Sequence, residues 1–252
     1  MKILACLLAG LMWLQQATAS QKKTSAKVSK ADKAHSRARK LSGTFYNDKT
    51  KAVKYLQDIH SLRGEKGALP FLKPLLKRLK RGENVLELGS GPGIEFSEIV
   101  KQGFNATAVD ISAHMNEMVS KDIGSKQHSS PWRMITESIE TFETNDHLGV
   151  PKSFALIVAN ASFIHLAPDE LASTLIKYKK MLKSGGLMYV SFKGGEPGQL
   201  RVDNEGRPFT DMDEDGLKKL AKEASFEIDS IETTGDVLAR GGTYWIAAVF
   251  KN

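Results

Sequence analysis

Short apolar runs alternate with stretches of helical periodicity from Leu41 onward, and this alternation predicts an α/β sheet. Residues 154–159 (FALIVA) form a continuous apolar run, and residues 84–88 (NVLEL) carry three apolar residues; we expect both segments to be buried strands. Weaker runs predict further strands at residues 106–109, 133–135, 187–192, 227–234 and 243–250. No internal repeat or second domain boundary interrupts the pattern, so residues 41–252 are predicted to form one doubly wound α/β domain.

Helices are predicted between these strands, and local signals mark some of their ends. Ser112 suits the N-cap of the helix that follows the second strand. Residues 168–183 carry an apolar stripe, and Gly185 and Gly186 are predicted to stop that helix. A further helix is expected at residues 212–224.

The first twenty residues have the layout of a secretory signal peptide. Lys2 precedes an apolar stretch at residues 3–14, and the polar stretch that follows ends in Ala-Thr-Ala, which resembles a cleavage site. A helix made of the apolar stretch would rise about 18 Å, too little to cross a hydrocarbon core of about 30 Å. We therefore expect residues 1–20 to direct export or membrane association, with a cytoplasmic location as the alternative.

Residues 21–40 are strongly basic and lack periodic apolar positions, so we expect a disordered linker. Their eight Lys/Arg against one acid stand directly behind the apolar stretch and oppose its translocation, which favours the cytoplasmic alternative. Besides tethering, weak contact with anionic surfaces is the further role that this composition suggests.

The positive charge of the chain is concentrated in its first third. The formal net charge is +7, yet residues 21–81 hold 18 Lys/Arg and 4 Asp/Glu, whereas residues 82–252 hold 17 and 25. The body of the protein is therefore mildly acidic, and we expect no stable nucleic-acid partner. Cys6 is the one cysteine, which excludes a disulfide framework, a thiolate metal site and a Cys nucleophile from the folded part, and no metal is expected.

A glycine-rich turn, VLELGSGPG, follows the first predicted strand. Glycines at 89, 91 and 93 let a ligand lie against bare backbone at the carboxyl edge of the sheet, where open α/β folds bind ligands. A dinucleotide fingerprint would need its third glycine at position 94, which is Ile94, and no phosphate loop ending in Gly-Lys-Ser/Thr is present. The spacing therefore disfavours both a dinucleotide enzyme and a nucleoside triphosphatase.

With Glu87 two residues before the first glycine, this run matches the first motif, E/D-x-G-x-G-x-G, of the class I S-adenosylmethionine-dependent methyltransferases. Asp110, 17 residues after Gly93, matches the second motif, an acid that closes the next strand. The stretches FALIVANASFIHL and MLKSGGLMYVSFKGG continue the match, so the chain resembles this family over about residues 41–252. The resemblance implies a mostly parallel seven-stranded sheet with an antiparallel last strand, S-adenosylmethionine as the cofactor, and methyl transfer as the activity.

The resemblance also implies which residues bind the cofactor. Asp110 would bind the ribose hydroxyls, the glycine loop would face the methionine part, and Glu137 would contact the adenine amino group. The implied cofactor-binding residues are Glu87, Gly89, Ser90, Gly91, Gly93, Asp110, Ile111, Glu137, Ser138 and Asn160.

Residues 160–166 (NASFIHL) bear on the acceptor. They lack the Asn/Asp-Pro-Pro-aromatic motif of adenine methyltransferases and resemble the small-molecule branch of the family, in which residues 194–210 would fold over the acceptor pocket. His165 lies near the predicted strand ends, and the usual pKa of histidine suits a general base; packing beneath the loop is the alternative.

Tyr46 and Tyr55 could cap the cofactor, again with packing as the alternative.

The sequence thus predicts methyl transfer from S-adenosylmethionine to a small-molecule acceptor by in-line displacement, with His165 as the catalytic residue. Two other functions stay open. One is an S-adenosylmethionine-binding protein without catalysis, and the other is a protein or nucleic-acid methyltransferase recruited by the basic arm.

Overall fold

The computed structural model describes residues 38–252 except 39, 64–69, 127, 152, 199 and 237–242. The described residues belong to one compact unit, Ala38–Asn252. The predicted signal peptide at residues 1–20, and the predicted basic linker up to residue 37, lie outside the described residues. Within the described ranges, no helix combines the length and apolar character needed to cross a membrane.

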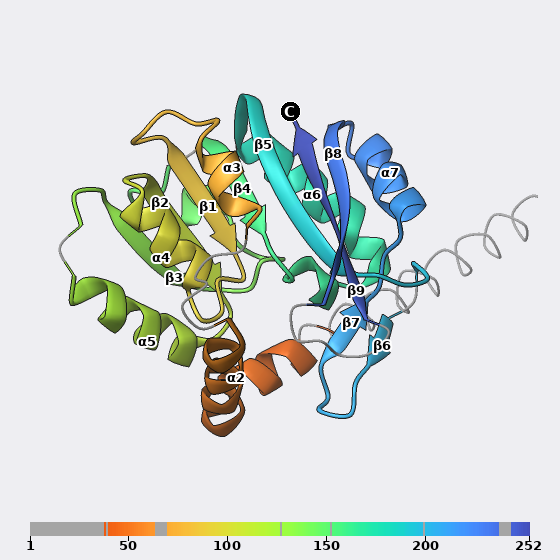
Figure 1. Ribbon diagram of the computed structural model, residues 1–252, viewed down its shortest axis with the longest axis horizontal. Helices are drawn as coiled ribbons and strands as arrows, with labels where there is room; N and C mark the ends of the chain where they lie inside the picture. Colours follow the sequence, from red (N-terminus) through yellow and green to blue (C-terminus); the bar gives the residue numbers. More distant parts are fainter. Residues whose placement is uncertain are drawn as a thin grey trace, which may run out of the picture. The chain divides into compact units, whose positions relative to one another are not determined.

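A seven-stranded sheet forms the centre of this unit, with the strand order β3-β2-β1-β4-β5-β9-β8 (Figure 1). The strands are β1 (Asn84–Leu88), β2 (Asn105–Asp110), β3 (Trp132–Thr136), β4 (Phe154–Ala159), β5 (Leu182–Lys193), β8 (Glu227–Gly235) and β9 (Tyr244–Lys251). The first five are mutually parallel, and β9 runs antiparallel to both of its neighbours. The predicted mostly parallel sheet with an antiparallel last strand is confirmed.

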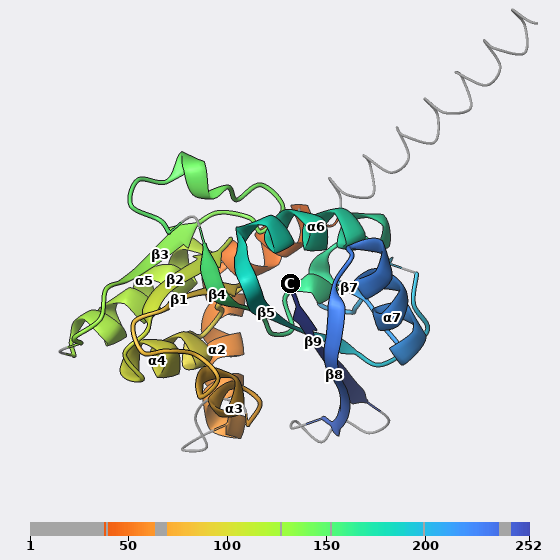
Figure 2. The ribbon, with the colours of Figure 1, turned by 90° about the horizontal axis from the view of Figure 1, so that it is seen from above.

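Helices cover both faces of the sheet (Figure 2). Side chains from α3 (Leu72–Leu76), α4 (Ile94–Lys101) and α5 (Ala113–Gly124) pack on one face. Side chains from α6 (Leu171–Met181) and α7 (Glu214–Glu223) pack on the other. The remaining helical segments are residues 40–47, α2 (Lys49–Arg63) and the short 3-10 helices η2 (Thr144–Asp146), η3 (Phe163–His165) and η4 (Pro168–Glu170).

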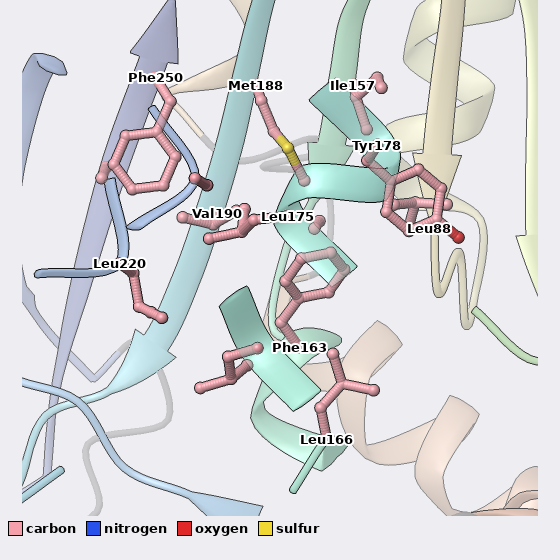
Figure 3. Close-up of a cluster of buried hydrophobic side chains, with 14 of the residues drawn as sticks. Leu88, Ile157, Phe163, Leu166, Leu175, Tyr178, Met188, Val190, Leu220 and Phe250 are labelled. Atoms are coloured by element: carbon pink, nitrogen blue, oxygen red, sulfur yellow. The ribbon is translucent and has the colours of Figure 1, made fainter. Parts of the chain in front are cut away.

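The core lies in two layers because successive strand residues point to opposite faces. In β4, Leu156 and Val158 pack toward α4, whereas Ile157 and Ala159 pack toward α6. Both faces are covered, so every position of β4 is buried and its apolar run is continuous. Figure 3 shows part of the second layer, in which Leu88, Ile157, Phe163, Leu166, Leu175, Tyr178, Met188, Val190, Leu220 and Phe250 gather.

The helix predicted at residues 168–183 is shorter than expected, and the prediction of its end was wrong. Residues 168–170 form the 3-10 turn η4, and α6 ends at Met181. Leu182 is already extended, with ψ 141°, because it pairs with Phe154 at the beginning of β4. Gly185 and Gly186 therefore lie within β5 and do not stop the helix.

Residues 194–210, expected to form a loop, contain a two-stranded antiparallel hairpin, β6 (Leu200–Val202) with β7 (Pro208–Thr210). Thr210 is fully buried, and its hydroxyl donates to the Leu166 carbonyl at 2.7 Å, which fastens β7 beside η3. The following helix begins at Glu214 instead of 212, because Asp213 is its N-cap and accepts from the Gly216 N–H at 2.7 Å.

Candidate functional site

The carboxyl ends of β1, β2 and β4 border a cavity of about 130 Å³, which we name the β1–β2 cavity. Eight of the ten residues that the resemblance implies for cofactor binding line it. These are Glu87, Gly89, Ser90, Gly91, Asp110, Ile111, Ser138 and Asn160. The other two, Gly93 and Glu137, are not among its lining residues.

The three glycines of the turn after β1 have different structural roles. All have positive φ, 71° at Gly89, 45° at Gly91 and 72° at Gly93. A Cβ at Gly89 would lie 2.5 Å from the Ser162 Cβ, and one at Gly93 would lie 2.4 Å from a Val119 methyl, so these two glycines permit close packing. A Cβ at Gly91 would meet no atom within 4 Å. Gly91 is therefore the glycine whose bare backbone borders open space in the cavity.

Asp110 closes β2 and holds the loops on both sides of the cavity. Its carboxylate accepts two backbone hydrogen bonds at 2.8 Å, from the Gly91 N–H and the Ser112 N–H. The residue is 7% exposed, and burial raises the pKa of its carboxyl group while these two hydrogen bonds oppose the shift. The helix cap predicted next to it is confirmed, because the Ser112 hydroxyl accepts from the Met115 N–H at 3.3 Å.

Three buried serine hydroxyls at the cavity have no hydrogen-bond partner in the part of the chain that the structure describes. They belong to Ser42, Ser90 and Ser162. A buried hydroxyl left without a partner costs about 1–3 kcal/mol, so this lining suits a polar ligand. The adenosine and amino-acid groups of S-adenosylmethionine offer such partners, and Asp110 offers an acceptor for ribose hydroxyls. The residues present therefore fit the cofactor that the resemblance implies.

Glu137 lies beside this cavity without lining it. Its carboxylate oxygen is 2.7 Å from Nε2 of His147, an ion pair when that imidazole is protonated. Ser138 and Glu140, from the turn that follows β3, line the cavity in its place. The acid that borders this part of the cavity is therefore Glu140.

The helix at residues 40–47 borders the cavity on another side. The Ser112 hydroxyl donates to the Tyr46 carbonyl at 2.6 Å. The Asn47 amide group accepts from the Ala113 N–H at 3.2 Å and donates to the Ile111 carbonyl at 3.3 Å. These bonds fasten the helix to the segment that follows β2, and they place the Tyr46 ring in the cavity lining.

His165 is held by hydrogen bonds on both ring nitrogens. Nδ1 lies 2.7 Å from the Pro208 carbonyl, and Nε2 lies 3.0 Å from the Tyr46 hydroxyl. A carbonyl can only accept, so Nδ1 carries the proton and Nε2 of the neutral ring accepts from Tyr46. Burial lowers the pKa of His165 to about 4, and Arg207 and Lys193 act in the same direction. At neutral pH this histidine is an uncharged partner of Tyr46, and it is a weak base.

A second cavity of about 340 Å³ adjoins the first, and we name it the β5–β9 cavity because those strands supply its floor. The two cavities share six lining residues, namely Tyr46, Tyr55, Ile59, Asn160, Ala161 and His165. A ligand in one cavity would therefore lie next to a ligand in the other.

The backbone is strained where the two cavities meet. Ala161 has φ 54°, a left-handed conformation that costs a residue other than glycine about 1–3 kcal/mol. The Ser191 hydroxyl holds this turn, because it accepts from the Ala161 N–H and donates to Oδ1 of Asn160, both at 2.8 Å. Nδ2 of Asn160 is then the part of that side chain left to donate to a ligand.

Comparison with known protein families identifies the family to which this chain belongs. A family model described as a methyltransferase domain matches residues 60–231. The chain belongs to this methyltransferase family. Its cofactor is S-adenosylmethionine, and its fold is that of the class I enzymes. No curated protein matches the sequence of this methyltransferase.

Solved structures with similar folds include enzymes of several kinds. The Burkholderia thailandensis 1,6-didemethyltoxoflavin-N1-methyltransferase, solved with 1,6-didemethyltoxoflavin and S-adenosylhomocysteine, is 19% identical over 80% of this chain and 86% of its own, with a TM-score of 0.58. A Methanosarcina mazei S-adenosylmethionine-dependent methyltransferase is 17% identical over 74% and 98%, also with a TM-score of 0.58. The (4+2)-cyclase SpnF is 15% identical over 83% and 94%, with a TM-score of 0.62. At these identities the likeness shows the fold alone.

Sequence reasoning missed the contacts that join the two cavities. Tyr46 and His165 are 119 residues apart, and Ser191 is 31 residues from Asn160. Only the aromatic character of Tyr46 suggested from the sequence that it could cap the cofactor. Nothing in the sequence singles out Ser191 or Ser42.

Proposed function

We propose that this methyltransferase transfers the methyl group of S-adenosylmethionine to a small-molecule acceptor bound in the β5–β9 cavity. The supporting observation is that the two cavities share lining residues, among them Asn160, Ala161 and His165. The volume of about 340 Å³ lies in the usual range of small-molecule sites, roughly 300–1,000 Å³. Cofactor in the first cavity and acceptor in the second would then face each other across this junction.

The protein contributes chiefly by positioning its ligands. When bound, the cofactor supplies a methyl group on a positively charged sulfur, which an acceptor lone pair displaces in line. Asp110 is placed to accept hydrogen bonds from the ribose, and the bare backbone of Gly91 leaves room beside it. Tyr46 and Tyr55 line both cavities, where they border the space between the two ligands. Holding two reactants in this way can supply most of the acceleration that a displacement of this kind needs.

The state of His165 narrows the choice of acceptor atom. An imidazole with a pKa of about 4 removes protons poorly at neutral pH, and its Nε2 lone pair already accepts from Tyr46. We therefore propose that the acceptor oxygen or nitrogen arrives with its lone pair free, and that His165 positions the Tyr46 ring. The predicted role of His165 as a general base is tested by the turnover of His165→Ala, which a base would lower far more than the cofactor affinity.

The test is an assay of the purified protein with deuterated-methyl S-adenosylmethionine and a small-molecule extract. Formation of S-adenosylhomocysteine together with a small product that carries the label is the expected result, and Asp110→Ala serves as the control with weakened cofactor binding. Label found only in protein or nucleic acid, with salt-sensitive binding that deletion of residues 21–40 abolishes, would indicate the alternative recruited by the basic arm. Cofactor binding without any S-adenosylhomocysteine would indicate a protein without catalysis.

We further propose that residues 1–20 act as a signal peptide and that residues 21–37 of the predicted linker tether the enzyme domain, whose compact unit includes Ala38. The apolar stretch behind Lys2 supports export, and the basic composition of residues 21–40 supports weak contact with anionic surfaces. Sequencing the N-terminus of the protein isolated from its native cells tests the first point, because an intact Met1 would contradict cleavage.

A further inference from the structure

We propose that the acceptor is an uncharged, planar aromatic molecule that lies flat on the floor of the β5–β9 cavity. This inference deepens the function proposed above and rests on it. Three observations carry it, namely the register of the strands in the floor, the aromatic walls, and the interactions that three of the four charged side chains of the lining already make with the protein.

The floor of the cavity has its smallest side chain at its centre, which leaves a hollow there. Ser191 of β5, Ala247 of β9 and Glu232 of β8 lie side by side in register, and all three line the cavity. Ala247 is the smallest side chain of this row and lies in its middle. Neighbouring strands are about 4.8 Å apart, so the row is about 10 Å long, which matches the length of two fused six-membered rings. The next row on the same face consists of Lys193, Trp245 and Thr234.

Aromatic rings, including Tyr189 of β5 itself, form the walls at the ends of this floor. Phe71 and Tyr189 stack face to face at one end, with centroids 3.7 Å apart and an interplanar angle of 3°. Phe209 of the β6–β7 hairpin lines the other end, and the rings of Tyr46 and Tyr55 face the junction with the β1–β2 cavity. Aromatic pairs gain about 0.5–1.5 kcal/mol beyond the area that they bury, so these walls favour a ring over a saturated molecule of equal size.

Three of the four charged side chains of the lining already interact with the protein. Nε of Arg207 donates to Asp203 at 2.8 Å, and Nζ of Lys193 lies 3.8 Å from the centroid of the Phe209 ring. Asp236 accepts from the indole N–H of Trp245 at 3.0 Å. Glu232, the fourth charged residue of the lining, is exposed to solvent at the far end of its row. The cavity therefore selects its ligand by shape and ring contact more than by charge.

The inference can be tested by binding alone. Naphthol and its saturated counterpart decahydronaphthol have the same carbon skeleton and hydroxyl group, but only naphthol is flat and aromatic. Calorimetric titration into the full-length protein saturated with S-adenosylhomocysteine should show naphthol binding about three- to tenfold more tightly. Equal affinities, or tighter binding of decahydronaphthol, would overturn the inference.

Two variants and a matched control locate the binding. Ala247→Leu fills the hollow and should weaken naphthol binding by about tenfold or more, with the affinity for S-adenosylhomocysteine unchanged. Thr233→Leu adds a leucine on the opposite face of the same sheet, outside the cavity lining, and should bind naphthol as the wild type does. Phe71→Leu keeps an apolar side chain but removes a ring. It should therefore reduce the ratio of the naphthol affinity to the decahydronaphthol affinity. Unchanged naphthol affinity in Ala247→Leu would refute the placement.

The outcome is separable from that of the proposed function, because calorimetry does not require turnover. A labelled product without an aromatic ring would leave the proposed function standing and overturn this inference. The expected naphthol preference together with no labelled product from any extract would support the aromatic cavity and contradict the proposed function.

Discussion

Replacing His165 with glutamine should remove a pH-dependent part of the stability of this methyltransferase. Burial is the main reason that the pKa of His165 falls from 6.5 to about 4. The native protein therefore keeps the imidazole neutral at pH values at which the unfolded chain protonates it. Glutamine has no ionisable group, and its carbonyl can still accept a hydrogen bond from Tyr46.

The expected magnitude follows from the linkage between proton binding and folding. One pKa unit corresponds to about 1.36 kcal/mol, so a fall from 6.5 to about 4 is worth about 3 kcal/mol. Because the native pKa lies below the unfolded one, this contribution is fully present above the unfolded value of 6.5 and is lost as the pH falls through about 4. Over that range the free energy of unfolding of the wild type should fall by about 3 kcal/mol more than that of His165→Gln.

Urea unfolding at a series of pH values from about 4 to about 7.5 measures this difference. Tyr46→Phe is the matched control, because it removes the hydroxyl bonded to Nε2 and leaves the histidine buried. It should therefore keep the pH dependence of the wild type. If the wild type and His165→Gln give parallel curves, the imidazole is not held neutral by burial, and the reasoning about its weak basicity fails with it.

Three further changes have expected outcomes of their own. Asp110→Ala should weaken S-adenosylmethionine and S-adenosylhomocysteine alike, by about 10- to 150-fold in calorimetric titrations, and unchanged affinities in a folded variant would contradict the placement of the ribose. Gly93→Ala should lower the free energy of unfolding by about 1–3 kcal/mol in urea, because its Cβ would meet Val119 at 2.4 Å; an unaltered midpoint would contradict this packing. Deletion of residues 1–37 should leave the affinity for S-adenosylhomocysteine unchanged, whereas deletion of residues 1–47 should weaken it about tenfold or more; equal losses would show that the helix at 40–47 does not shape the cavity.

The sheet could be predicted from the sequence wherever burial alone decides the residue type. Strands β1 and β4 were predicted to the residue, because helices cover both faces of the sheet and most positions of these strands are apolar. The end of α6 could not be predicted in this way. The helix ends where Leu182 pairs with Phe154, and no local sequence pattern predicts this contact between two strands. The β6–β7 hairpin could not be predicted because each of its strands is only three residues long, too short to show an alternating pattern.

The candidate site could be predicted where its residues follow one another at a strand end. Glu87, the glycine turn and Asp110 are of this kind, and the structure brings them together around one cavity. The junction between the cavities depends instead on tertiary packing. The bond from Tyr46 to His165 and the bond from Ser191 to Asn160 each join distant segments, and no local pattern of residue types announces either of them.

The position of β9 constrains the order in which the sheet can assemble. β8 comes earlier in the chain than β9, yet it pairs with the sheet only through β9, which lies between β5 and β8. Until β9 is in place, the β8 strand lacks the strand with which it pairs in the native sheet, although it has already been synthesised. The parallel strands β1 to β5 can form first, and the two last strands must then be added together. The floor of the β5–β9 cavity therefore depends on the last strand of the chain, and any step that delays β9 leaves an open edge on β5.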